Sequence, residues 1–245
     1  MSVEMLLTDI QQRFGYQMLR PAAELTPIRE TLPTGLTAVD ELLDGGLLRG
    51  ATHCINGRPT SGATSLLYAA VASAQAQGIA VVYLDMGLLF DPPNAAAAGI
   101  AIERLLLLSG TSVQRTLFLI RALAQQRLPC LLVIDQPPAL PLGQLKAVLR
   151  DAPLTLLALS SQLLGGEYAY PSQPELGTAP SAERQRFSGQ MQVMLECERG
   201  DWRMERGDLV GFNSELRLTA HPFLPYRQVR LSFDIPPEET CSARW

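Results

Sequence analysis

The feature that most constrains the fold is an alternation of short apolar runs with helical segments between residues 51 and 160. The apolar runs predict strands at 51–56, 79–85, 105–108, 130–135 and 154–160. Helices are expected at about 64–77, from about 94, at 112–127 and near 142–150. Apolar strands without polar alternation are typical of a parallel sheet covered on both faces. The sequence therefore predicts an α/β fold with a central, mostly parallel sheet flanked by helices.

The pattern changes after residue 160. Residues 165–189 are rich in Gly, Pro, Ser and Gln without an apolar period, which predicts a mobile loop. Strands are expected at 191–196, 202–206, 215–219 and 228–233, with Gly200-Asp201 as a turn between the first two. The sheet is therefore expected to end in antiparallel strands.

The first 33 residues have a different character from the core. Residues 1–20 are interpreted as an amphipathic helical arm, whose apolar side chains follow helical spacing: Val3, Leu6, Leu7, Ile10, Phe14 and Met18. Residues 21–33 contain three prolines and read as a linker, followed by a core at 34–235 and a tail at 236–245. The arm either packs on its own core or docks elsewhere, and the sequence leaves both open.

Composition argues against global electrostatic attraction to nucleic acid, a disulfide framework, and a membrane or secreted protein. A net charge of −4 gives no global positive field toward nucleic acid, and Lys146 is the single lysine. The four cysteines lack C-x-x-C spacing, so free buried thiols are expected at Cys54, Cys130, Cys197 and Cys241. Because no apolar run approaches about 20 residues and no signal-peptide layout is present, a soluble cytoplasmic protein is expected.

A phosphate-binding loop is predicted where the first parallel strand meets a helix. The motif G-x-x-x-x-G-K-[ST] is matched except that alanine replaces lysine; the residues are Gly57, Arg58, Pro59, Thr60, Ser61, Gly62, Ala63, Thr64 and Ser65. Its backbone N–H groups can wrap phosphates, but the ammonium that reaches the β- and γ-phosphates is missing. An ordinary strand-to-helix turn that binds nothing is the alternative.

An apolar strand ending in Asp135 has the layout of a Walker B strand, whose carboxylate holds Mg²⁺ directly or through water. Thr64 would supply the hydroxyl ligand of the same ion. An aspartate that merely ends a buried strand is the alternative.

The chain resembles the RecA-type recombinases and their RadA-like relatives over about residues 31–234. The resemblance rests on Thr34-Gly35-Leu36-Thr37-Ala38-Val39-Asp40, the segment 42–50, the P-loop frame, Tyr83-Leu84-Asp85 with Asp91-Pro92, the Asp135 strand, 156–162, and Gly207-Asp208-Leu209-Val210-Gly211. It implies a RecA-like P-loop NTPase core, ATP with Mg²⁺ as cofactor, and work in DNA recombination, repair or damage response.

Departures from the family pattern concern catalysis. Aligning Asp85 and Asp91 puts Gly87 where the family has the glutamate that activates water, and residues 217–225 lack the lysines that reach ATP across a subunit interface. With Ala63, three charged groups are lost, and each such loss typically costs about 10²-fold in rate. The resemblance therefore implies a non-hydrolysing accessory protein, similar to the ImuA-like proteins, with no catalytic residue and at most weak ATP and Mg²⁺ binding.

Contacts to single-stranded DNA are expected after the strand at 154–160. The resemblance makes Gln162 the residue that senses the γ-phosphate and leads into a DNA-binding loop. That loop holds aromatic and guanidinium groups suited to bases and phosphates: Tyr168, Tyr170, Arg184, Arg186 and Phe187. A solvated linker is the alternative, and the segment 136–141, where the family's first DNA loop would lie, is short and uncharged.

Two further groups are expected to carry no chemistry. His53 and His221 have no metal-ligand partner nearby in sequence, and the charges from Arg199 to Asp208 read as the solvated face of a hairpin.

Two rival functions stay open at this stage. One is an active DNA-dependent ATPase in which Arg58 or a partner's arginine replaces the lysine. The other is a nucleotide-independent binder of single-stranded DNA through 165–189. Partners are expected to be a protein or a second copy bound through the N-terminal helix, together with single-stranded DNA, and no membrane.

Overall fold

The computed structural model describes residues 30–137, 148–149, 152–161 and 191–235. The chain divides into two units, Met1–Glu30 and Thr31–Trp245, and the account below concerns the second. The predicted arm, the loop 165–189 and the tail lie outside the described residues, as does most of the helix expected near 142–150.

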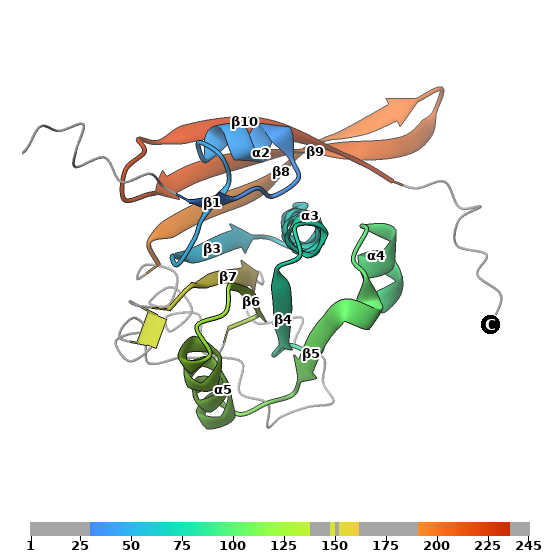
Figure 1. The fold of residues 1–245 in the computed structure, drawn as a ribbon. Helices are drawn as coiled ribbons and strands as arrows, with labels where there is room; N and C mark the ends of the chain where they lie inside the picture. The colour runs from blue at the N-terminus through green and yellow to red at the C-terminus, as the bar shows by residue number, and fades with distance from the viewer. Residues whose placement is uncertain (1–29, 138–147, 150–151, 162–190, 236–245) are drawn as a thin grey trace, which may run out of the picture. The chain divides into compact units, whose positions relative to one another are not determined.

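An eight-stranded sheet forms the centre of this unit (Figure 1), with the strand order β10-β9-β8-β3-β7-β6-β4-β5. The strands are β3 (Thr52–Gly57), β4 (Ala80–Asp85), β5 (Leu105–Ser109), β6 (Cys130–Asp135), β7 (Leu154–Ser161), β8 (Val193–Glu205), β9 (Asp208–Ala220) and β10 (Arg227–Asp234). The six strands from β8 to β5 are parallel to one another, whereas β9 pairs antiparallel with both β8 and β10. The predicted mostly parallel sheet with an antiparallel end is confirmed.

Helices cover both faces of the sheet. The helices are α2 (Thr37–Leu42), α3 (Ala63–Ala76), α4 (Pro92–Ala97), the 3₁₀ turn η2 (Ile102–Arg104) and α5 (Val113–Gln125). The short strands β1 (Thr31–Leu32) and β2 (Leu47–Leu48) form a separate antiparallel pair.

The core has two layers because side chains alternate across each strand. Val81, Leu131 and Leu157 face one side and pack with α3, whereas Val82, Leu132 and Leu156 face the other and pack with Ile120 of α5. Figure 1 accordingly shows α3 and α5 on opposite sides of the sheet. Burial on both faces explains why these strands are apolar throughout.

The predicted turn at Gly200-Asp201 is wrong. Strand β8 continues through both residues, and its pairing with β9 shifts register between Arg199 and Trp202, as at a β-bulge. The turn lies instead at Arg206-Gly207, where φ is 52° and 96°. Two consecutive residues with positive φ are what a tight two-residue hairpin requires.

His53 is a structural residue of the P-loop strand, as expected. Its Nε2 accepts a hydrogen bond from Leu48 N at 3.0 Å, and its Nδ1 lies 3.2 Å from Leu156 O. Because a carbonyl only accepts, Nδ1 carries the proton and the ring is neutral. Complete burial lowers the pKa of His53 to about 4. The described cysteines, Cys54, Cys130 and Cys197, are buried free thiols, also as expected.

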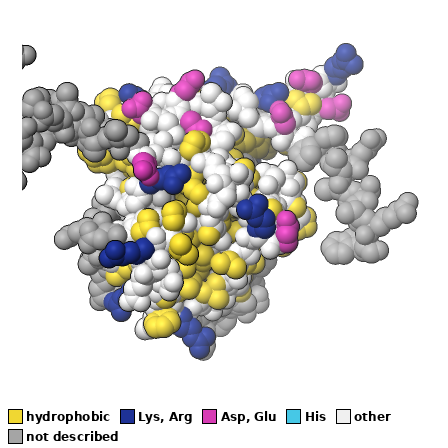
Figure 2. Space-filling model, in the orientation of Figure 1, with side chains coloured by type: hydrophobic (Ala, Val, Ile, Leu, Met, Phe, Trp, Pro, Cys, Tyr) yellow, Lys and Arg dark blue, Asp and Glu magenta, His cyan; other side chains and the backbone are white. Residues whose placement is uncertain are grey.

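Strand β5 leaves one sheet edge apolar and exposed. Leu106, Leu107 and Leu108 are exposed, and Leu106 keeps 63% of its surface accessible. Leu88 and Leu89, in the loop after β4, are exposed as well. Figure 2 shows apolar side chains gathered where β4 and β5 lie. Among the described residues, no helix is long and apolar enough to span a membrane.

Candidate functional site

The predicted P-loop adopts the strand–turn–helix geometry that such a motif needs. Strand β3 ends at Gly57 and α3 begins at Ala63, with a tight loop between them. A Cβ at Gly57 would lie 2.5 Å from the Ala63 Cβ and 2.6 Å from Ser61 Oγ, which is too close. Gly62 has φ of +88°, in the left-handed region that favours glycine. Both frame glycines are therefore required by the shape of the loop.

Several polar groups of the P-loop point to an anionic ligand. Within the described residues, the backbone N–H groups of Thr60, Gly62, Ala63 and Thr64 make no hydrogen bond, whereas Ser61 N donates to Arg58 O. The first N–H groups of any helix lack intrahelical partners and attract negative charge. Ser61 Oγ is buried inside the turn, facing Gly57, and also makes no hydrogen bond there. The loop is thus an open set of donors at the start of a 14-residue helix.

The carbonyl side of the P-loop is held by the C-terminal strands. Arg199 Nε donates to Thr60 O at 3.1 Å, and Cys197 Sγ donates to Ser61 O at 3.1 Å. Ser214 Oγ donates to the same Ser61 carbonyl. These contacts fix the carbonyls on one side of the loop.

An aromatic row extends this support. A Cβ at Gly62 would lie 2.5 Å from Phe233 Cε2, so the ring rests on the loop. Phe233 stacks on Phe212 with ring centres 5.2 Å apart, and Trp202 meets Phe212 at 6.1 Å. Arg199 lies 3.8 Å above the Trp202 ring centre. The row joins β8, β9 and β10 to the turn.

Asp135 lies at the carboxyl end of β6, where the sequence predicted it. Tyr83 OH donates to its Oδ2 at 2.9 Å. Its Oδ1 is buried and makes no hydrogen bond of normal geometry within the described residues. Burial raises the pKa of Asp135 to about 6, opposed by hydrogen bonds from Tyr83 and Gln136. A buried carboxylate at the end of a parallel strand suits a cation or a water bound to it.

Asp85 lies beside Asp135 on the neighbouring strand but has a structural role. The two are register partners of β4 and β6. Asp85 Oδ1 accepts from Leu89 N at 2.9 Å, and its Oδ2 accepts from Phe90 N at 3.1 Å. Its carboxylate therefore holds the loop that follows β4.

Comparison of the sequence with known proteins shows which family the chain belongs to. The model of the family described as "RecA N-terminal domain" matches residues 1–164. This chain belongs to the RecA family. It is 31% identical to Protein RecA of Gloeobacter violaceus over 166 residues, which cover 66% of this chain and 45% of that protein. It is 33% identical to Protein RecA of Streptomyces coelicolor over 168 residues, with 66% and 45% covered. The match spans about half the length of these RecA relatives.

Ala63 and Gly87 are two of the positions at which the sequence was expected to depart from the family pattern. Ala63 is the first residue of α3 and is 6% exposed, with only a methyl group where the motif has an ammonium. Gly87 follows β4, and a Cβ built on it would lie 3.1 Å from Gln136 Cγ. Gly87 therefore lies beside the segment that follows Asp135.

The residues present fit ATP and Mg²⁺ in part. The open N–H groups from Thr60 to Thr64 suit a polyphosphate, and Thr64 with Asp135 offers oxygen ligands of the kind that Mg²⁺ takes beside phosphate and water. Within the described residues, no group of three His, Cys, Asp or Glu side chains could hold a metal without such help. Mg²⁺ would neutralise charge on the phosphates.

The remaining sequence-predicted residues divide into two groups. Arg58 is exposed, and the structure gives it no contact with the loop interior. Gln162 and the proposed DNA contacts lie outside the described residues: Tyr168, Tyr170, Arg184, Arg186 and Phe187.

Sequence reasoning missed the residues that β8, β9 and β10 bring to the P-loop. Arg199 was expected on a solvated hairpin face, but it is half-buried and bonded to the loop. No local signal could have shown this, because the contact requires β8 to pair directly with β3. The same holds for Cys197, Ser214 and Phe233.

Proposed function

We propose that this RecA-family protein acts in DNA recombination, repair or the damage response as an accessory that does not hydrolyse ATP. The observation that carries this is Ala63, whose methyl group occupies the start of α3 in place of the lysine. Lys146 is the only lysine of the chain, so at most one other lysine could take over. Gly87 supports the proposal because no side chain is present there to activate water.

The test is steady-state ATP turnover with Mg²⁺, with and without single-stranded DNA. The wild type should match Asp135→Asn, a variant that reports contaminating ATPase in the preparation. Turnover in the wild type that disappears in Asp135→Asn would refute the proposal and favour the active ATPase instead. Two observations favour the active ATPase as a second candidate function: the P-loop keeps its shape, and the Asp135 carboxylate is present.

The accessory role includes a partner bound through residues 1–20, either another protein or a second copy. An amphipathic helix can lay its apolar face in a groove of its partner. Deleting residues 1–20 should lower the mass of any complex in size-exclusion chromatography with light scattering. An unchanged mass would exclude the arm as the docking element.

Binding of single-stranded DNA is proposed through 165–189. Replacing Tyr168, Tyr170, Arg184 and Arg186 together by alanine should remove a salt-sensitive affinity for a fluorescent oligonucleotide. Equal binding by the wild type and the variant would exclude this loop.

A further inference from the structure

One cationic side chain from another part of the chain contacts the P-loop. Arg199 Nε donates to Thr60 O, and the Arg199 guanidinium is held above Trp202. Within the described residues, it is the one cationic side chain outside the loop that hydrogen-bonds to it. Its two terminal NH₂ groups make no hydrogen bond in that part of the chain. The guanidinium is thus held in place through Nε, while its terminal NH₂ groups have no hydrogen-bond partner among the described residues.

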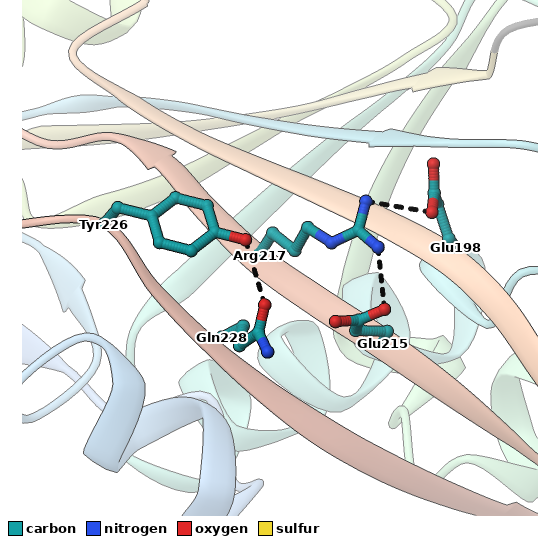
Figure 3. A network of polar contacts seen from close by, with 5 residues as sticks. All are labelled: Glu198, Glu215, Arg217, Tyr226 and Gln228. Carbon is teal, nitrogen blue, oxygen red and sulfur yellow. Dashed lines mark hydrogen bonds and ion pairs between the residues drawn. The ribbon is translucent and has the colours of Figure 1, made fainter.

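The charge of Arg199 is not neutralised by the acids around it. Each of three nearby carboxylates is paired with another arginine: Glu198 with Arg217 at 3.0 Å, Asp201 with Arg230 at 2.9 Å, and Asp234 with Arg203 at 2.6 Å. Figure 3 shows Arg217 held between Glu198 and Glu215. Alternation along β8 also separates Glu196 and Glu198 from Cys197 and Arg199, which contact the P-loop.

The loop beside Arg199 carries hydrogen-bond donors that have no partner among the described residues. Its N–H groups from Thr60 to Thr64 are open, and the buried Ser61 Oγ faces into the turn without a hydrogen-bond partner among the described residues. A partnerless buried hydroxyl is costly unless a ligand or water satisfies it. Arg199 therefore contacts the same turn that carries these donors.

We propose that Arg199 supplies the positive charge for polyphosphate binding at this P-loop, in place of the absent lysine. The ligand class is a nucleoside triphosphate, recognised through its phosphates by the open backbone donors and the terminal groups of Arg199. A guanidinium suits this task because its paired N–H groups match phosphate oxygens. The inference rests on the proposed function, in which the site is retained without hydrolysis.

The experiment is isothermal titration calorimetry of the full chain with Mg-ATP and with sodium tripolyphosphate, at low ionic strength. Arg199→Gln keeps an amide that can donate to Thr60 O but removes the charge, and should weaken both affinities about tenfold or more. Arg203→Gln is the matched control, with the same change in net charge on the same hairpin, and should bind as the wild type does. Arg199→Lys should retain most of the affinity, which keeps the test decisive if Arg199→Gln does not fold.

A second experiment tests whether Arg199 contributes to polyphosphate binding through its charge. Adding the family's lysine to the variant, as Ala63→Lys with Arg199→Gln, should restore binding. Equal affinity in the wild type and Arg199→Gln would overturn the proposal, as would a wild type that binds neither probe. The accessory proposal would survive both results, because only ATP turnover refutes it.

Discussion

Acid should destabilise this protein through His53, and the size of the effect follows from its burial. An unfolded histidine has a pKa of about 6.5, whereas burial lowers the pKa of His53 to about 4 in the fold. The unfolded state therefore binds the proton more readily, and stability from this group falls as pH drops from about 6.5 toward 4. The loss reaches about 2 kcal/mol at pH 5 and about 3 kcal/mol below pH 4.

The effect of Asp135 on stability has the opposite pH dependence and must be separated from that of His53. Its pKa is raised to about 6, so protonation stabilises the folded state as pH falls below 6. His53→Gln removes the histidine contribution but keeps that of Asp135. The difference in unfolding free energy between the wild type and the variant therefore isolates His53.

Urea unfolding of both proteins at pH 7 and pH 5 measures that difference. The wild type should lose about 2 kcal/mol relative to His53→Gln on going from pH 7 to pH 5. A difference that stays constant between the two pH values would refute the reasoning. It would mean that His53 is not held neutral between Leu48 and Leu156.

Three further substitutions test the local arguments. Gly62→Ala should cost about 2 kcal/mol or more in urea unfolding, because it adds a Cβ 2.5 Å from the Phe233 ring at a φ of +88°. Asp85→Asn should cost about 1–3 kcal/mol, because an amide cannot accept from both loop N–H groups as well as a carboxylate; hydrogen exchange at Leu89 and Phe90 should then accelerate. Leu106→Lys should change stability by less than about 0.5 kcal/mol, because the side chain is 63% exposed, but should lower concentration-dependent light scattering.

Much of the fold could be predicted from local patterns. Strand β6 was predicted with its observed bounds, and β3, β4 and α3 to within one residue at each end. Strand–helix order and apolar burial follow from periodicity, which needs only neighbouring residues. The turn at Gly200-Asp201 was wrong because a β-bulge can absorb a Gly-Asp pair without ending the strand.

The candidate site was predictable only in part. The P-loop frame from Gly57 to Ser65 and the carboxylate of Asp135 are sequence signals, because each is a contiguous motif at the end of a strand. The absence of lysine at Ala63 is equally plain in the sequence. The residues that support the loop could not be predicted from the sequence, because they come from other strands.

The sequence by itself determined which elements form, where the phosphate-binding turn lies, and which charge it lacks. The tertiary structure decided what surrounds that turn. Arg199 lies 139 residues beyond Thr60 along the chain, yet it bonds to that carbonyl because β8 pairs in parallel with β3. Such a pairing joins strands far apart in sequence and depends on the packing of the whole sheet, so no local pattern specifies it.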